Sequence, residues 1–207
     1  MKINTEIKCN TLPCEDVKTE CYLLPEISLD TSKIKVFMIA EAVPENQNDY
    51  FYANKTLDTP AYLVNTIEAF NQAGLKVKSV EDIIDYGFYL TAAIKCAKKN
   101  YRISAKTIKQ CSFLLELELQ QFNNLLAIML MGDSAIKCFN YIAKRTKKQK
   151  IIPSEATYKI RKKKFYYGNI RVFPSYLMTG KNYLIEKTKQ RMIAEDLQKV
   201  IKLIMNK

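Results

Sequence analysis

Four short apolar runs, separated by longer segments with helical periodicity, constrain this sequence more than any other feature. The runs cover residues 34–40, 88–94, 126–131 and 170–173. Continuous apolar runs of this length are typical of strands buried on both faces of a parallel sheet. Alternation of such strands with helices predicts an α/β fold, a three-layer α/β/α sandwich with a central four-stranded, mainly parallel sheet.

The segments between the runs carry the periodicity and the end signals of helices. We expect helices at 61–73, 79–86, 104–122, 134–144 and 182–205, and a basic hairpin arm at 157–167 that turns at Gly168-Asn169. The chain length suggests one domain, residues 1–207. Within it we expect a cysteine-rich N-terminal segment, 1–33, followed by the α/β core, 34–207.

Each predicted strand is followed by a loop with polar or turn-forming residues. These loops begin at Glu41, Lys95-Cys96, Gly132-Asp133 and Pro174-Ser175. The carboxyl ends of parallel strands share one edge of a sheet, and ligands bind at that edge in open α/β folds. Glu41 directly follows a buried run and is therefore a candidate for chemistry. The alternative is a solvated loop carboxylate.

The formal charge of +12, from 33 basic and 21 acidic residues, favours a polyanionic partner, most often nucleic acid. The alternative is a compositional bias, because the chain is rich in Lys, Ile and Asn. No apolar run reaches the about 18 residues of a membrane span, and residues 1–13 lack the apolar core of a signal peptide. We therefore expect a cytoplasmic protein with no membrane partner.

The sequence contains no histidine, which excludes a large class of mechanisms. A histidine general base, a Ser/His or Cys/His nucleophile pair and a histidine-ligated metal are all ruled out. A nucleotide-binding protein or a small α/β hydrolase is disfavoured, because the five glycines form no phosphate-binding loop.

The six cysteines are more consistent with metal binding than with disulfides, given the expected reducing compartment. The N-terminal segment carries Cys9, Cys14 and Cys21. Cys96 follows a predicted strand and Cys111 lies on the next helix, so both can face that segment. Thiolates from two segments suit zinc or an iron–sulfur cluster. Cys138 lies among apolar residues of a predicted helix and is expected in the core.

Four sequence pieces follow one another along the chain. They are Glu41-Ala42-Val43-Pro44; Thr91 with Ile94-Lys95-Cys96 and the later Cys111; Met131-Gly132 with Ala135; and Val172-Phe173-Pro174-Ser175-Tyr176-Leu177. Their order and spacing resemble the uracil-DNA glycosylase superfamily, most closely its iron–sulfur (family 4-like) branch, with this chain as a divergent member. The resemblance covers about residues 9–205. It implies a DNA-repair protein that hydrolyses the N-glycosidic bond of a flipped-out uracil or other damaged base.

The resemblance also implies a [4Fe–4S] cluster. Its ligands would be Cys14, Cys21, Cys96 and Cys111, because Cys21-Tyr22-Leu23 fits the family's second N-terminal cysteine. A Cys9/Cys14 pair is the alternative, and neither spacing is the family's usual C-x-x-C. The remaining alternative is that no cluster forms.

For the site, the resemblance implies a catalytic role for Glu41. The residues expected to bind the base are Ala42, Val43, Phe51, Ala92 and Ser175, with Tyr50 and Tyr52 as alternatives to the Phe51 ring. Ala92 stands where the family has a base-reading Asn, and Phe173 where it has a His that stabilises the departing base. A second alignment places Leu177 near the missing His. The donors that could replace it are Ser175, Tyr176 and Thr179.

DNA contacts are expected from basic loops and from the loop after the fourth strand. The residues are Lys98, Lys99, Arg102, Lys162, Lys163, Tyr176 and Leu177. The basic side chains would bind phosphates, and Leu177 with Met178 would wedge into the base stack, as the family's corresponding loop does. The alternative for each basic run is a solvated face. Two hypotheses follow, a monomeric glycosylase and a catalytically inactive iron–sulfur DNA-binding protein of the same fold.

Overall fold

The structure, a computed structural model, describes residues 2–10, 14–53, 59–179 and 186–206. Its main sheet has the strand order β3-β2-β5-β7-β6. The strands are β2 (Val36–Ala42), β3 (Phe88–Ile94), β5 (Ala127–Met131), β6 (Phe165–Tyr167) and β7 (Ile170–Ser175). Neighbouring strands are parallel, except that β6 runs antiparallel to β7. The predicted mainly parallel sheet is therefore confirmed.

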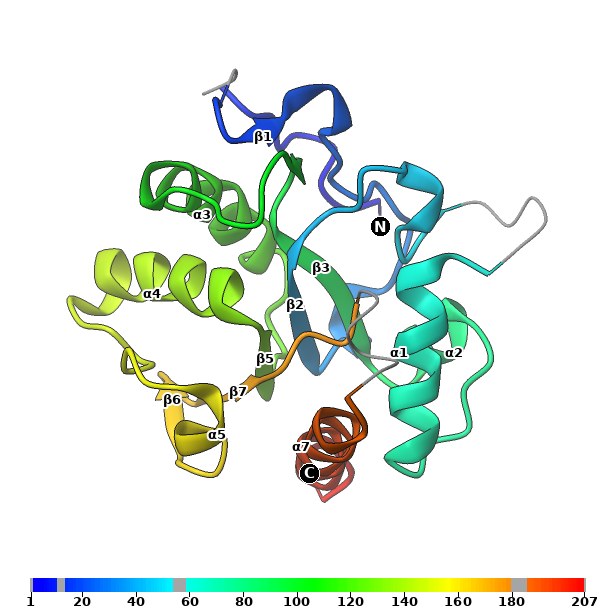
Figure 1. Ribbon diagram of the computed structural model, residues 1–207. Coiled ribbons are helices and arrows are strands. Elements are labelled where there is room, and N and C mark those ends of the chain that lie inside the picture. Colours follow the sequence, from blue (N-terminus) through cyan, green and yellow to red (C-terminus); the bar gives the residue numbers. More distant parts are fainter. Residues whose placement is uncertain (1, 11–13, 54–58, 180–185, 207) are drawn as a thin grey trace.

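Helices cover both faces of this sheet and make three layers (Figure 1). One face carries α3 (Ala105–Leu119) and α4 (Asp133–Lys147), and the other carries α1 (Ala61–Gln72), α2 (Val80–Asp85) and α7 (Lys187–Met205). Alternate residues of β2 supply the two cores, because successive side chains of a strand point to opposite faces. Phe37 and Ile39 belong to the core under α3 and α4, whereas Met38 belongs to the core under the other helices. The predicted α/β/α sandwich is confirmed.

Three details of the prediction are wrong. The main sheet has five strands rather than four, because Phe165–Tyr167 forms β6 and pairs with β7 across the Gly168-Asn169 turn. The hairpin does not begin at residue 157, since Thr157–Ile160 forms the short helix α5. β7 also continues through Pro174, where the described pairing is to β5 alone. Proline is tolerated on a strand that has a neighbour on one side only.

The helix ends agree with the polar residues that precede them. Ser104 caps α3 through its side chain, and Ser79 forms a capping box with Asp82 at the start of α2. The last helix begins at Lys187, and residues 182–185 of its predicted range lie outside the described residues. Within the described part of the chain, none of the helices is both long and apolar enough to cross a membrane.

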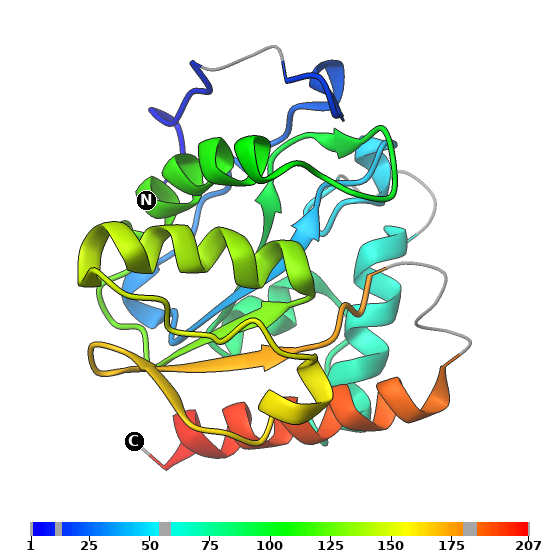
Figure 2. The same ribbon diagram turned by 60° about the vertical axis from the view of Figure 1, so that its left-hand side comes forward.

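The cysteine-rich N-terminal segment lies across the carboxyl end of β3. The two-residue strands β1 (Val17–Lys18) and β4 (Ala97–Lys98) pair antiparallel. Short 3₁₀ helices lie at Thr19–Cys21, Thr31–Lys33 and Gln47–Asp49. The Asp16 carboxylate accepts hydrogen bonds from the backbone N–H of Ser104 and from the hydroxyl of Thr107, both at 2.5 Å. The backbone N–H of Leu23 donates to the Lys95 carbonyl at 2.7 Å. These bonds hold the segment beside α3 (Figure 2).

Candidate functional site

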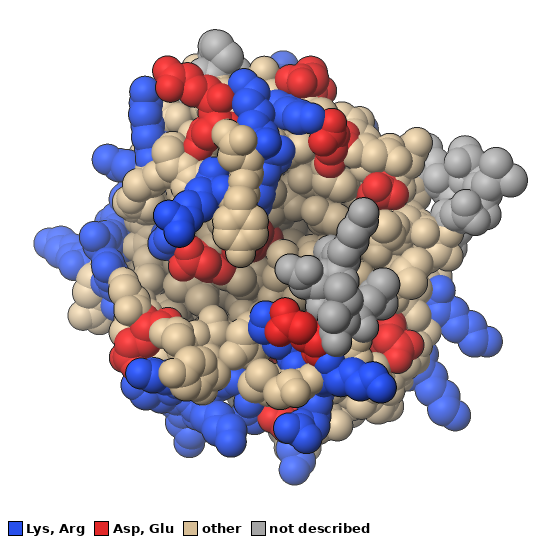
Figure 3. All heavy atoms as spheres, in the orientation of Figure 1, with Lys and Arg blue, Asp and Glu red and all other residues tan. Residues whose placement is uncertain are grey.

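A cleft of about 860 Å³ opens at the carboxyl ends of the parallel strands. Its walls come from the ends of β2 and β7, the loop after β4 and the first turn of α4. Residues that line it include Glu41, Lys98, Tyr101, Arg102, Ser134, Lys137, Tyr176, Leu177 and Lys189. Figure 3 shows a hollow on this face of the molecule, with both basic and acidic side chains around it. The strand-end loops therefore share one edge, as the parallel topology requires.

The Glu41 carboxylate bonds to residues on two different walls of this cleft. Its Oε2 pairs with the Nζ of Lys98 at 2.6 Å, and its Oε1 accepts a hydrogen bond from the backbone N–H of Ser134 at 3.1 Å. The side chain is 17% exposed. α4 follows Gly132, which has no side chain to cap the helix, so Glu41 supplies an acceptor at that N-terminus. A negative charge is favourable there because the helix dipole is positive at this end.

Gly132 also fixes the position of Glu41 by packing. Its φ is +98°, and a Cβ built on it would lie 2.7 Å from the Oε1 of Glu41. A side chain at residue 132 would therefore displace the carboxylate. An ion pair, a helix end and a close backbone approach together hold Glu41 in one place.

A second, smaller pocket of about 250 Å³ adjoins the cleft and shares Glu41, Lys98, Leu177 and Thr179 with it. Tyr62 and Thr179 provide its hydroxyl groups. The Tyr62 hydroxyl donates to the Ala42 carbonyl at 3.3 Å. Burial raises the pKa of Tyr62 to about 12, although a hydrogen bond with Thr179 acts in the opposite direction. Tyr62 therefore keeps its proton at neutral pH and can act as a donor.

The predicted base-binding residues divide into two groups. Ala42 and Val43 line the small pocket, but the backbone N–H of Val43 donates to the Ile94 carbonyl at 3.2 Å, so it is already committed. Phe51 and Ala92 have no exposed surface and line neither the cleft nor the small pocket. Both belong to the core under α1, α2 and α7.

Ser175 and the alternative aromatic residues also lie in the interior. The Ser175 hydroxyl is fully buried and donates to the Asp196 carboxylate on α7 at 2.9 Å. Tyr50 is 2% exposed, with its ring centroid 5.1 Å from that of Phe51. The Tyr52 hydroxyl accepts a hydrogen bond from the backbone N–H of Leu90. The structure gives each of these side chains a packing or hydrogen-bonding role.

The residues predicted to contact DNA also fall into two groups, those that line the cleft and those that do not. Lys98, Arg102, Tyr176 and Leu177 line the cleft, whereas Lys99, Lys162 and Lys163 are exposed but do not line it. The ammonium group of Lys163 pairs with the Glu155 carboxylate at 3.2 Å.

Sequence reasoning missed several lining residues, notably Tyr62, Ser134, Lys137 and Lys189. Ser134 had a signal, since a helix was expected to start there, two residues after Gly132. Lys137 lies one helical turn after Asp133, and pairs with its carboxylate. Whether such a surface lysine faces a cleft depends on how its helix docks, which periodicity does not reveal.

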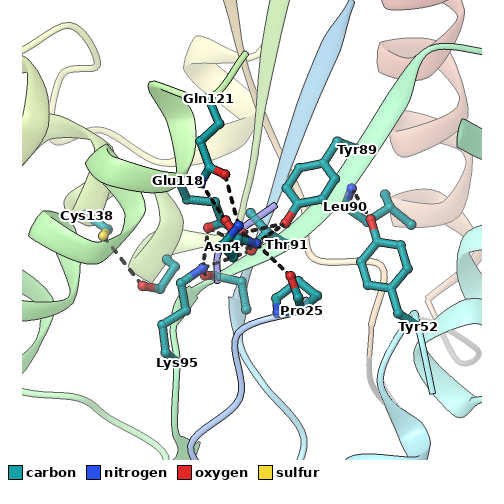
Figure 4. A network of polar contacts seen from close by, with 12 residues as sticks. Asn4, Pro25, Tyr52, Tyr89, Leu90, Thr91, Lys95, Glu118, Gln121 and Cys138 are labelled. Carbon is teal, nitrogen blue, oxygen red and sulfur yellow. Dashed lines mark hydrogen bonds and ion pairs between the residues drawn. The ribbon is translucent and has the colours of Figure 1, made fainter. Parts of the chain in front are cut away.

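Behind the cleft, a buried polar network joins β3 to α3 and to the N-terminal segment (Figure 4). The Nζ of Lys95 lies 2.6 Å from the Oε2 of Glu118, and neither side chain is exposed. The hydroxyls of Tyr89 and Thr91 donate to the Glu118 carboxylate at 2.6 and 2.9 Å. Asn4 donates to the Tyr89 hydroxyl at 3.0 Å. The two buried charges are thus paired and hydrogen-bonded, as burial of ions requires.

Five thiols gather near the end of β3. Burial, together with the nearby thiols of Cys111, Cys9, Cys14 and Cys21, raises the pKa of Cys96 to about 12. These thiols oppose one another's ionisation because thiolates carry like charges. A bound cationic metal would reverse this effect, since coordination deprotonates a thiol.

The cysteines do not form a site for a single metal ion. Among the described residues, no three Cys, Asp or Glu side chains lie close enough together to hold one ion. Thiolates are the ligands of iron–sulfur clusters, so the chemistry of these donors fits such a cluster. Cys138 is fully buried on α4, with its Sγ 3.8 Å from the Ala93 carbonyl oxygen, in the predicted core position.

Comparison with known proteins gives one family. A family model described as the uracil DNA glycosylase superfamily matches residues 29–200. The matched range includes the main sheet, the lining of the cleft and small pocket, and three cysteines, Cys96, Cys111 and Cys138. It begins after the three N-terminal cysteines. Among curated proteins, none matches the chain.

Proposed function

The chain belongs to the uracil DNA glycosylase superfamily, whose members act on DNA, and from this we propose that it removes a damaged base from DNA. The substrate would be a flipped-out uracil or another damaged base, and the reaction would be hydrolysis of its N-glycosidic bond. The observation that carries the proposal is the place of Glu41, between a wide basic cleft and a small pocket at the carboxyl edge of the sheet.

In the proposed reaction, the target nucleotide leaves the base stack and its base enters the small pocket. The bond between C1′ and the base nitrogen breaks, the base departs with the bonding electron pair, the oxygen of a water molecule adds to C1′, and one proton of that water passes to the departed base. Positive charge develops on the sugar as this bond lengthens. The carboxylate of Glu41, held by Lys98 and Ser134, would stabilise that charge without having to reorganise.

Two hydroxyls would support the departing base in place of the absent histidine. Tyr62 and Thr179 both line the small pocket, and the Tyr62 hydroxyl would exchange its 3.3 Å hydrogen bond to the Ala42 carbonyl for one to the base. Hydrogen bonds to the base would stabilise the negative charge that it carries away. Ala92 is buried and offers no polar side-chain atom, so recognition of the base edge would fall to these hydroxyls and to backbone groups.

The loop after β4 would bind the DNA backbone. Lys98 and Arg102 line the cleft on either side of Tyr101, whose side chain is 92% exposed. A basic groove with an exposed aromatic ring is the pattern by which proteins hold single-stranded nucleic acid. Lys162 and Lys163, outside the cleft, would contact phosphates further along the strand.

A specific observation also supports the second candidate function, a DNA-binding protein without catalysis. Ala92 and Phe173 replace the polar residues on which the resembling family relies for reading and releasing uracil. The small pocket has hydroxyl groups, but among its described lining residues there is no side-chain amide to replace the family's Asn.

Base excision can be measured directly with oligonucleotides that carry one uracil, hypoxanthine or xanthine, either single-stranded or in a duplex. We expect free base and an alkali-labile abasic site to appear together when the protein is in excess over DNA. Tight binding with no base released from any of these substrates would contradict the glycosylase proposal and favour the non-catalytic one.

We also propose that the converging thiols hold a [4Fe–4S] cluster. Cys96, Cys111 and Cys14 would be ligands, and the fourth would be Cys21 or Cys9. Cys9 and Cys21 both lie near enough to Cys96 to raise the pKa of its thiol, so either could supply the fourth ligand. When bound, the cluster would tie the N-terminal segment to β3 and α3, and thiolates are the ligands that such clusters need.

Replacement of a cluster ligand is expected to abolish iron binding. Protein purified without oxygen should carry iron and sulfide and absorb visible light, and Cys96→Ser should lose all three signals. Cys138→Ser is the matched control, because that thiol is buried in the core, and it should keep them. Comparison of Cys9→Ser with Cys21→Ser identifies the fourth ligand. Colourless wild-type protein with no iron would refute the cluster.

A further inference from the structure

A side cavity of about 600 Å³ adjoins the main cleft. It lies between the start of α3, the outer side of α4 and residues 150–157. Five residues line both spaces, namely Ile103, Ile108, Asp133, Lys137 and Thr157. The side cavity therefore lies directly beside the cleft that contains Glu41, within reach of a polymer bound there.

The lining of the side cavity combines an apolar floor with a cationic rim. Ile108 and Ile136 are nearly fully buried beneath it, and the half-buried ring of Tyr141 stands beside them. Lys144 and Lys150 are exposed at the rim. This surface can accept a flat apolar group below and a negative charge above.

The acidic residues at the rim are neutralised by lysines. Asp133 pairs with Lys137 at 2.5 Å, and Glu155 pairs with Lys163 at 3.2 Å. Lys144 forms no ion pair within the described part of the chain, and the ammonium group of Lys150 donates to the Ser154 hydroxyl. The rim is thus left with a net positive charge, which complements a phosphate.

We propose that the side cavity binds a second unstacked nucleotide of the same DNA strand, next to the target nucleotide. The proposal rests on the proposed function, because it takes the DNA strand to occupy the main cleft. The base would lie on the apolar floor, and its phosphate would face Lys144 and Lys150. Proteins bind single-stranded DNA through two kinds of contact. Bases pack on apolar or aromatic surface, and phosphates pair with lysines. A paired duplex keeps neighbouring bases stacked, so the site selects single-stranded DNA.

Binding experiments test this subsite without requiring catalysis. The probe is a single-stranded oligonucleotide with a stable abasic analogue at the target position and the fluorescent base 2-aminopurine at one of the flanking positions. We expect the fluorescence to change on binding at one flanking position far more than at the others. The same oligonucleotide in a full duplex should show a smaller change.

Variants that fill or neutralise the cavity complete the test. Ala156→Trp and Ala105→Trp lie on its walls, outside the main cleft, and should weaken single-strand binding about tenfold and remove the position-specific signal. Lys144→Ala with Lys150→Ala should weaken binding and reduce its salt dependence. The controls are Val64→Trp, at an exposed position of α1, and Lys76→Ala with Lys78→Ala, in the loop between α1 and α2; all should bind as the wild type does.

Equal fluorescence changes at every flanking position, with wild-type affinity in the cavity variants, would overturn the subsite. The excision assay reports separately on the proposed function. A protein that releases no base but shows the position-specific signal would support the subsite and contradict the glycosylase proposal. A protein that releases base but shows no position-specific signal would support the glycosylase proposal and contradict the subsite.

Discussion

The variant Glu41→Gln is expected to excise base roughly 10²–10³-fold more slowly than the wild type, the loss typical of one preorganised electrostatic group. Glutamine keeps the size of the side chain and an acceptor for the Ser134 N–H, so α4 stays capped. It removes the negative charge that would face the developing cation on the sugar, and it leaves Lys98 without its partner at 2.6 Å. Single-turnover rates on a uracil oligonucleotide, with protein in excess, measure the effect on the chemical step.

Two further variants show whether position as well as charge matters. Gly132→Ala keeps the carboxylate but places a Cβ where the Oε1 of Glu41 now lies 2.7 Å away, so it should also lower the rate. Glu68→Gln, at an exposed position of α1, removes one negative charge far from the cleft and should excise normally. A Glu41→Gln variant with wild-type turnover would remove Glu41 from the mechanism.

The strands could be predicted because helices cover both faces of the sheet. β3 occupies its predicted range, and β5 differs from it by one residue, since a strand buried on both sides has no polar positions to interrupt its apolar run. β1 and β4 could not be predicted. A two-residue strand has no measurable period, and this pair joins segments that lie far apart in the sequence.

The sequence predicted only those parts of the candidate site whose position follows from the order and direction of the strands. Glu41 lies at the binding edge because it is near the carboxyl end of the parallel strand β2, whatever its neighbours are. The expected roles of Phe51, Ala92 and Ser175 follow from the resemblance alone, and the structure buries all three side chains. Tyr62 reads as one position of an ordinary amphipathic helix, and its access to the small pocket depends on how α1 docks against β2.

The buried position of the Lys95 side chain could not be predicted from the sequence either. The place of Lys95 after β3 suggests a functional loop, as it does for Glu41. Its side chain instead turns into the core and meets Glu118, a residue that periodicity alone places on an ordinary helix. A sequence does not show which charges will be paired in the interior, because the partner comes from another element.

Removal of either member of this buried pair is expected to destabilise the protein strongly. Glu118→Ala leaves the Lys95 ammonium buried without a counter-ion, and it also removes the acceptor for Tyr89 and Thr91. We expect the free energy of unfolding to fall by about 3–5 kcal/mol, the range for breaking a buried ion pair. Urea unfolding followed by circular dichroism measures this loss, provided that the wild type and variants carry the same metal content.

The double variant Lys95→Met with Glu118→Leu distinguishes charge isolation from lost packing. It removes both charges and keeps apolar volume, so it should be more stable than either single variant, because replacement of a whole buried pair is often neutral. Glu26→Ala breaks the exposed pair between Lys2 and Glu26, and should change stability by about 1 kcal/mol or less. If Glu118→Ala were no more destabilising than Glu26→Ala, the network would not stabilise the fold. A double variant as unstable as Glu118→Ala would instead mean that the hydrogen bonds from Tyr89 and Thr91, rather than the ion pair, hold α3 to β3.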